Sequence, residues 1–132
     1  MIIHSALLLS FTDSAESIPE SPLEFDFDLH YAESLDACFM IAAAEDIDLI
    51  IIDVDSCRDK LSYIRQLLQM NDLTARIPIL LLSSRPEEYS EAPALHAVDG
   101  VVSATLPSRE SATRIRELCA LIERNQHSQA EQ

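Results

Sequence analysis

Asp53 and Asp55 are the residues of this chain best placed to do chemistry. Asp53 ends an unbroken apolar run at residues 49–52, and Asp55 follows two positions later. A strand that is apolar along its whole length is typical of a parallel sheet covered on both faces. Ligands of such sheets bind beyond the carboxyl ends of the strands. The pattern therefore predicts that Asp53 lies at an open edge and marks a candidate active site.

A second apolar run, residues 77–82, leads into Ser83, Ser84 and Arg85. We expect these three residues at the same edge, where the hydroxyls either contact a ligand or bond the local backbone. The Arg85 guanidinium either pairs with Asp53 or points into solvent. Asp55 also has two interpretations: it helps Asp53 to hold a cation, or it caps the following turn.

The elements that must position these residues alternate along the chain. Apolar runs predict five strands, and segments with helical spacing separate them. This alternation favours an α/β fold with a five-stranded parallel sheet and helices on both faces. The expected strands are residues 6–9, 25–31, 49–54, 77–82 and 101–102, and the helical positions are Leu35, Phe39, Met40 and Ala43, then Leu61, Ile64, Leu67 and Leu68, then Ile115, Leu118, Cys119 and Ile122.

Prolines interrupt this regular pattern in two places. Pro19 and Pro22 fall between the first two strands, and Pro86 and Pro93 bracket the segment after the fourth strand. Proline lacks an amide donor and breaks a helix interior. We therefore expect the first and fourth helices to be short or irregular. The pattern places one domain at residues 1–125 and a polar tail that frays at 126–132.

Composition excludes several classes of function. A chain of 132 residues with 48% hydrophobic residues and a net charge of −14 predicts one acidic domain that binds neither nucleic acid nor an anionic membrane directly. No segment is long enough to span a bilayer. Cys38, Cys57 and Cys119 are too few and too widely spaced for a zinc site or a disulfide scaffold, which favours a reducing cytoplasm.

Catalytic motifs are missing from the sequence as well. Gly100 is the only glycine, so a glycine-rich loop that cradles phosphates cannot be built. The four histidines have no ligand spacing, and no serine or cysteine sits in a nucleophile signature. We therefore do not expect an enzyme.

The order of elements resembles the receiver domain of bacterial response regulators, a three-layer flavodoxin-like fold, over residues 6–124. Residues 48–53, Asp-Leu-Ile-Ile-Ile-Asp, are similar to the family's third strand, which would make Asp53 the position of the phospho-acceptor. Residues 77–84 are similar to the fourth strand, and Ser83 matches the hydroxyl that contacts the phosphoryl group.

The resemblance fails at the residues that support phosphorylation. It implies a bound Mg²⁺, two acids closing the first strand, and a lysine ending the fifth. Ser10 and Phe11 stand in place of the acids, and residues 103–107 contain no cation. Lys60, the only lysine, is expected on the surface. We therefore expect no metal and no other cofactor; if Mg²⁺ does bind, Asp13, Asp53 and Asp55 are the candidate ligands.

Three functions follow from these observations. The first is a non-catalytic, receiver-like interaction module of bacterial signalling that binds a protein partner or itself and is not phosphorylated in the standard magnesium-dependent way. Its predicted interface is the last helix, where reciprocal ion pairs would form across a two-fold axis, through Arg109, Arg116, Glu117 and Glu123. The second is a phosphorylatable receiver that uses Asp53 with substituted metal ligands. The third is an assembly domain similar to the wing domain of basic amino-acid decarboxylases.

Overall fold

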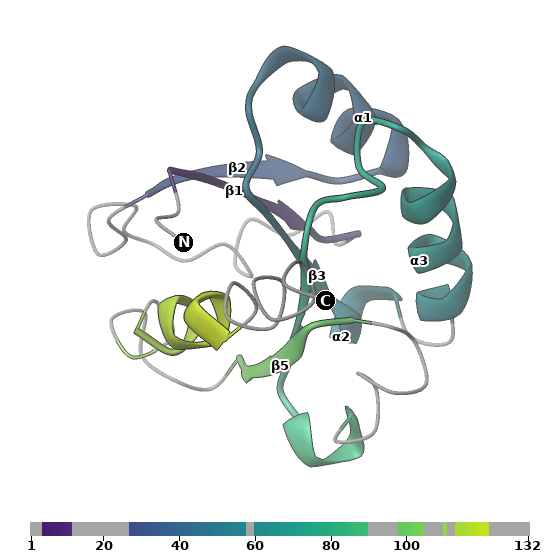
Figure 1. Cartoon of the computed structure of the whole chain (residues 1–132). Helices are drawn as coiled ribbons and strands as arrows, with labels where there is room; N and C mark the ends of the chain where they lie inside the picture. Colours follow the sequence, from purple (N-terminus) through teal and green to yellow (C-terminus); the bar gives the residue numbers. More distant parts are fainter. Residues whose placement is uncertain are drawn as a thin grey trace, which may run out of the picture.

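One sheet of five parallel strands forms the centre of the molecule. The computed structural model describes residues 4–11, 27–57, 60–89, 98–104, 110 and 113–121. Within them the strand order is β2-β1-β3-β4-β5, and every neighbouring pair runs parallel (Figure 1). The strands are β1 (Ser5–Leu9), β2 (Asp28–Ala32), β3 (Leu49–Asp53), β4 (Ile79–Ser83) and β5 (Gly100–Ser103). The predicted five-stranded parallel sheet is confirmed.

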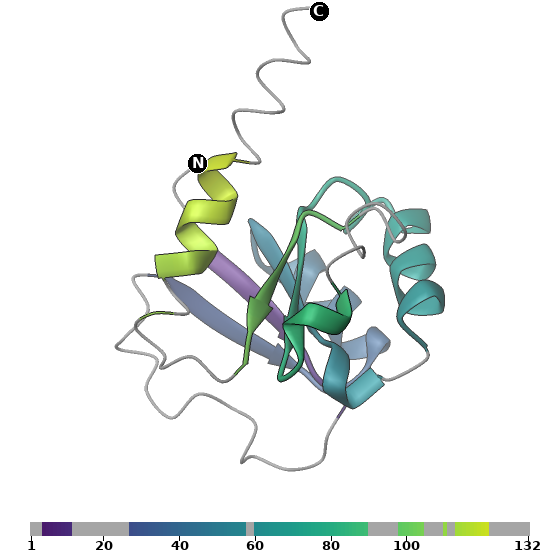
Figure 2. The same ribbon diagram turned by 90° about the horizontal axis from the view of Figure 1, so that it is seen from below.

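Helices cover both faces of this sheet, as predicted. The named helices are α1 (Leu35–Ala44), α2 (Val54–Cys57), α3 (Leu61–Met70) and the 3-10 turn η4 (Pro86–Tyr89). Residues 113–121 are also helical. Figure 2 shows the sheet between α3 on one side and the helix at 113–121 on the other. This arrangement has the three layers that the alternation of elements predicts.

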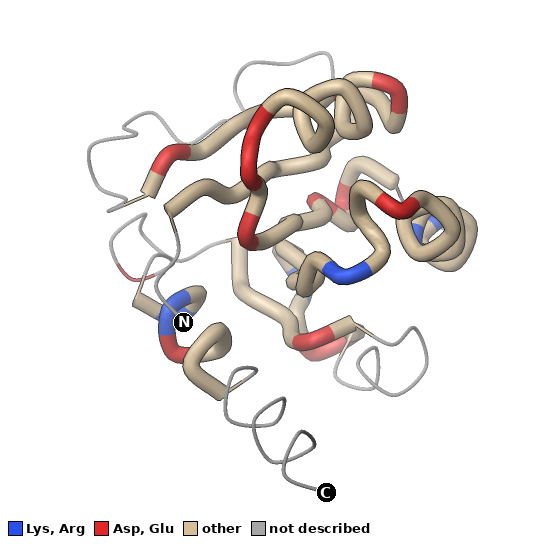
Figure 3. Tube along the Cα trace, turned by 45° about the horizontal axis from the view of Figure 1, so that its top comes forward, with Lys and Arg blue, Asp and Glu red and all other residues tan. Residues whose placement is uncertain are grey.

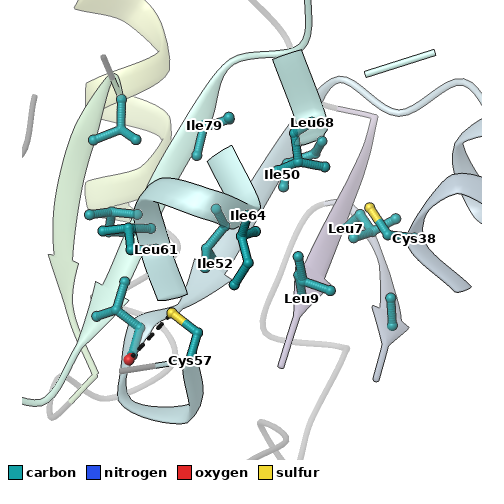
Figure 4. Close-up of a cluster of buried hydrophobic side chains, with 14 of the residues drawn as sticks. Leu7, Leu9, Cys38, Ile50, Ile52, Cys57, Leu61, Ile64, Leu68 and Ile79 are labelled. Atoms are coloured by element: carbon teal, nitrogen blue, oxygen red, sulfur yellow. Dashed lines mark hydrogen bonds between the residues drawn. The ribbon is translucent and has the colours of Figure 1, made fainter. Parts of the chain in front are cut away.

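Two apolar clusters hold the three layers together. On the side of α1 and α3, alternate strand residues such as Leu7, Ile50 and Ile79 pack with Ile64 and Leu68 of α3 (Figure 4). The other cluster joins the remaining strand residues to the helix at 113–121, and consists of Ala6, Leu8, Phe27, Leu49, Ile51, Leu80, Val102, Ile115, Leu118 and Cys119. Because both sides of each central strand are buried, the apolar runs need no polar alternation.

Local hydrogen bonds explain where the helices begin and end. Ser34 has an extended backbone and its hydroxyl accepts the Ala37 N–H at 3.1 Å, which is the usual N-cap of a helix. At the end of α3, the buried Thr74 hydroxyl donates to the Leu68 carbonyl, one of the carbonyls that the helix leaves unpaired. These caps fix the length of α1 and α3 on their side of the sheet.

Acidic side chains close the amino end of the sheet. The Asp48 carboxylate accepts the N–H groups of His4 at 2.8 Å and Ser5 at 3.1 Å, and Asp99 accepts the Ile79 N–H at 2.9 Å. Each bond satisfies a backbone donor at the start of a strand. These acids are therefore structural, and they lie at the end of the sheet opposite Asp53.

Several predicted boundaries differ from those in the structure. Val54 begins α2 instead of ending β3, and β2 extends to Ala32. Strand β4 starts at Ile79, two residues later than predicted, after Pro78, which has no N–H to donate. Met40 is one of the apolar positions whose spacing predicts the helix α1, yet 72% of its surface is exposed. The described part of the segment after β4, where a short fourth helix is expected, is one 3-10 turn. Residues 12–26, between the first two strands, where a short first helix is expected, lie outside the described residues, as does the boundary at residue 125.

The three cysteines are buried thiols. Burial raises the pKa of the Cys38 thiol to about 11, so this residue stays protonated and acts as a small apolar core residue.

In the described part of the chain, no helix has both the length and the apolarity that crossing a membrane requires.

Candidate functional site at the carboxyl edge of the sheet

Asp53 lies where the sequence places it, as the last residue of the central strand β3. Only 9% of its surface is exposed. The Ser10 hydroxyl donates to its Oδ2 atom at 3.0 Å. Asp53 is thus hydrogen-bonded to the residue that follows β1.

The parallel register brings Ser10 to this position. Leu9 of β1 pairs with Ile52 of β3, so the next residue on each strand lies at the same level of the edge. The Ser10 N–H donates to the Ala32 carbonyl at 3.0 Å, which continues the pairing of β1 with β2. Ser10 is buried to the same degree as Asp53. The hydroxyl thus occupies the place where the family resemblance implies an acid.

Burial is the main electrostatic influence on Asp53. Desolvation raises the pKa of this carboxyl, and the negative charge of Asp55 raises the pKa further. The hydrogen bonds from Ser10 and from the amides of Asp55 and Ser56 lower the pKa, but they do not cancel the effect of burial. Among the residues that the structure describes, no basic side chain contributes to the shift. Asp53 is thus a carboxyl whose ionisation opposes folding.

Ser56 is part of this edge, although no sequence pattern singles it out. Its hydroxyl accepts the Phe11 N–H at 3.0 Å and donates to the Asp53 carbonyl at 2.7 Å. These two bonds tie the end of β1 to the first turn after β3. A serine three residues after the strand-ending aspartate was the only available signal, and serine is too common in such turns to be distinctive.

Asp55 connects the third strand to the fourth. Its Oδ2 atom accepts the Ser84 N–H at 3.0 Å. The buried Ser83 hydroxyl accepts the Arg85 N–H at 3.0 Å, so this hydroxyl bonds local backbone. The edge therefore brings Asp53, Asp55, Ser83 and Ser84 together, and it uses Asp55 and Ser83 to order the loop after β4.

Arg85 belongs to the exposed surface of the same loop. Its guanidinium lies 3.5 Å from the Glu88 carboxylate, and the Arg85 side chain is 72% exposed. This ion pair is local, within η4 and the residue before it, and Asp53 receives no contribution from Arg85. Burial raises the pKa of the Tyr89 hydroxyl in η4, and the negative charge of Asp55 raises this pKa further. No sequence pattern singles out Tyr89.

The described residues at this edge do not fit a magnesium ion. Hard cations bind several carboxylate, carbonyl or water oxygens. Here a hydroxyl donates to Asp53 and an amide donates to Asp55, and within the described ranges no three His, Cys, Asp or Glu side chains gather. The third candidate ligand, Asp13, lies outside the described residues. Lys60, just before α3, is exposed, as expected for a surface lysine.

The predicted interface on the last helix is described only in part. Arg116 and Glu117 are exposed on it, while Arg109 and Glu123 lie outside the described residues. Glu117 lies 3.3 Å from Arg114, one turn earlier on the same helix. Part of the charge expected to pair across a two-fold axis is therefore engaged within the helix. An exposed ion pair of this kind contributes little to stability.

Comparison with known proteins gives matches at the level of structure. No protein-family model matches the sequence, and no curated protein matches it either. Among solved structures, a response regulator from Desulfuromonas acetoxidans superposes with a TM-score of 0.66 at 23% identity, covering 89% of this chain and 98% of that one. A response regulator from Thermotoga maritima gives a TM-score of 0.67 at 13% identity, covering 90% and 99%.

A chemotaxis response regulator of Vibrio cholerae gives a TM-score of 0.63 at 13% identity, covering 89% of this chain and 99% of that chain. This chain has the receiver fold. The identities are low, so the likeness concerns the path of the backbone and not the residues of the site. In the receiver fold of this chain, the edge that carries Asp53 has a serine where the family resemblance implies an acid.

Replacing Asp53 by asparagine is expected to stabilise the protein at neutral pH. The pKa of this carboxyl is higher in the folded state than its ordinary value, so protonation of Asp53 stabilises the fold. That stabilisation is present at low pH and is lost as the pH rises through the folded pKa. Asparagine keeps the shape and an acceptor for Ser10 without the buried charge. We expect the free energy of unfolding at pH 7 to rise by about 1 kcal/mol, a size usual for a single substitution.

Urea unfolding at pH 7 and at pH 4 measures this effect. The difference between Asp53→Asn and the original protein should shrink at the lower pH. Glu87→Gln, which removes an exposed carboxylate, serves as the control and should change stability by less than about 0.5 kcal/mol at either pH. A loss of stability in Asp53→Asn of equal size at both pH values would show that burial does not dominate this carboxyl.

Proposed function

We propose that this chain is a receiver-fold signalling module that acts by binding proteins and is not phosphorylated on Asp53 by the magnesium-dependent route. The fold supports the signalling class, because several solved structures that share it are response regulators and receiver domains. The residues at the edge of the sheet support the second half of the proposal. The function then depends on the surface of the fold and not on a reaction at its edge.

The hydrogen bond from Ser10 to Asp53 is the observation that carries this proposal. A phospho-accepting aspartate and the phosphoryl group that it attacks both carry negative charge, so the pair needs a cation beside it. In this chain the Ser10 hydroxyl, a neutral donor, occupies the place beside Asp53 where the resemblance implies an acid that holds Mg²⁺, and the Asp53 side chain is 9% exposed. Phosphorylation would therefore bring an anion to a nearly buried carboxylate without the metal ligands that offset its charge.

The charge at the edge supports the same conclusion. An acyl phosphate on Asp53 would add negative charge beside Asp55, which already raises the pKa of Asp53. A cation would be needed to offset that charge. Arg85 is paired with Glu88, and Lys60 lies on the exposed start of α3, so neither serves this purpose in the structure.

Intact mass spectrometry after incubation with acetyl phosphate and millimolar Mg²⁺ tests the proposal. We expect the mass of the protein to remain unchanged, because the described edge has Ser10 in the place of an acid and the sequence has no lysine at residues 103–107. Asp53→Asn is the matched blank, and a phosphorylatable receiver treated in parallel shows that the reagent is active. A gain of one phosphoryl group by the original protein, absent from Asp53→Asn, would overturn the proposal and favour the phosphorylatable receiver.

A further inference from the structure

Helix α1 is apolar on almost every side. Its sequence, Leu-Asp-Ala-Cys-Phe-Met-Ile-Ala-Ala-Ala, contains one charged residue, Asp36. Only Cys38 is fully buried, whereas Met40 is 72% exposed and both Ala43 and Ala44 are exposed. A helix that is apolar all round is normally buried all round. The outer face of α1 departs from that rule.

The neighbouring helix α3 shows the ordinary pattern on the same side of the sheet. It buries Leu61, Ile64 and Leu68 at helical spacing, and polar residues take most of its outer positions. Both helices pack on the same cluster of core residues, and α3 also exposes Tyr63 and Met70, but it separates them with polar residues, whereas the outer side of α1 has only Asp36 as a charged residue. The outer positions of α1, Met40, Ala43 and Ala44, therefore form an apolar strip that the described chain leaves uncovered.

A depression lies next to the end of α1, and its lining includes His4, Ser5, Glu45, Asp46 and Asp48 as well as apolar residues. This depression has a volume of about 700 Å³. Its apolar wall combines Ala42 and Ile47 with Leu73 and Ile77, which follow α3, and Leu73 is itself 46% exposed. Residues from two separate parts of the chain thus extend the apolar surface beyond the helix. A volume of this size accommodates several side chains of a partner.

Acidic residues surround this surface. Glu33 and Asp36 lie at the start of α1, and Glu45 and Asp46 at its end, all of them exposed. Residues 1–57 contain no lysine or arginine. In Figure 3 the tube through α1 and the segment after it carries red acidic positions and no blue basic ones. A second copy of the chain would bring like charges together here, whereas a basic partner would find complementary ones.

We propose that the outer face of α1 and the adjoining depression bind a basic amphipathic helix of a partner protein. The apolar stripe of that helix lies on Met40 and Ala43, with a side chain in the depression. Lysine and arginine on its flanks face Glu45 and Asp46 at one end and Asp36 at the other. This is the helix-in-groove mode of recognition, with electrostatic complementarity selecting the partner.

This inference rests on the proposed function, since it names the partner class of a protein-binding module. The two are tested separately. Phosphorylation is tested by mass at the carboxyl edge, whereas the α1 face is tested by binding to unmodified protein without any phosphate donor. A failure of one test therefore leaves the other result standing.

Fluorescence anisotropy with a labelled probe peptide tests the α1 face. The probe is a helical peptide with leucine spaced at i, i+3, i+4 and i+7 and with lysine and arginine on its flanks. We expect micromolar binding that weakens as salt is added. Met40→Gln and the double variant Glu45→Gln/Asp46→Asn should each weaken binding about tenfold. A peptide with glutamate in place of the basic residues should not bind.

Matched controls separate this face from the general acidity of the protein. Glu87→Gln/Glu88→Gln removes the same two charges from η4, and Leu121→Gln removes an exposed apolar residue, 49% exposed, from the last helix. Both controls should leave binding unchanged. Equal weakening by the controls, or no binding of the basic peptide, would overturn the proposal. A dimer seen by light scattering that Met40→Gln dissociates would also overturn it, because a second copy would then cover the face.

Discussion

Ser10→Asp is expected to lower the free energy of unfolding at pH 7 by about 3 kcal/mol, as uncompensated buried charges do. The Ser10 hydroxyl donates to Asp53 at 3.0 Å, and both residues are only 9% exposed. An aspartate at this position replaces a donor with a second carboxylate. Two carboxylates that share one buried site cannot both remain ionised without a cost.

The loss should depend on pH and on divalent cations. Because the folded pair holds a proton more tightly than the unfolded chain, the loss should be largest at neutral pH and should shrink as the pH falls toward 4. A pair of carboxylates also provides ligands that hard cations prefer. Millimolar Mg²⁺ should therefore raise the melting temperature of Ser10→Asp and leave that of the original protein unchanged.

Ser10→Asn is the matched control, since it has nearly the size of aspartate but adds no charge. Urea unfolding of both variants, with and without Mg²⁺, separates the effect of charge from the effect of size. If Ser10→Asp proved as stable as Ser10→Asn at pH 7, the side chain at position 10 would not face Asp53. The proposed reason for the lack of phosphorylation would then fail with it.

The sequence predicts the parallel sheet and its central strand well. Every residue of β3 is buried, which is what an unbroken run of Leu and Ile before Asp53 indicates. Periodicity likewise locates α3 and the helix that contains Ile115 and Leu118. These elements are predictable because burial leaves a clear mark on the spacing of apolar residues.

The same reasoning fails for α1, for a physical reason. Apolar residues occupy its inner and outer positions alike, so no spacing distinguishes the side that contacts the sheet. Leu35 and Phe39 are partly buried, but Met40 and Ala43 are exposed. The helix itself is predictable from its composition. The composition does not predict which side of α1 faces the sheet. The partner surface is inferred from the apolar side that faces away from it.

The contacts of the candidate site are also beyond the reach of sequence patterns. The sequence places Asp53, Asp55, Ser83 and Ser84 at one edge, because they end neighbouring strands. It does not say that Asp55 accepts the Ser84 N–H instead of capping its own turn. Both interactions satisfy one carboxylate with one amide, so their energies are similar. The relative position of the two strand ends decides between them.

Leu81→Ala tests that relative position and is expected to cost about 3 kcal/mol of unfolding free energy, within the usual range for a buried leucine. Leu81 is fully buried, pairs with Ile52 of β3, and lies in the cluster on the side of α1 and α3. Removing its side chain leaves a cavity between the sheet and α3. Urea unfolding at pH 7 measures the loss.

Leu82→Ala removes the same atoms one residue later and is the matched control. Leu82 pairs with Asp53 and is only partly buried, on the opposite face, so its loss should be about 1 kcal/mol. Successive strand residues point to opposite faces, so a slip of one residue in β4 would exchange the two environments. A larger loss for Leu82→Ala than for Leu81→Ala would therefore show that Ser83 and Ser84 do not lie where Asp55 can accept the Ser84 N–H.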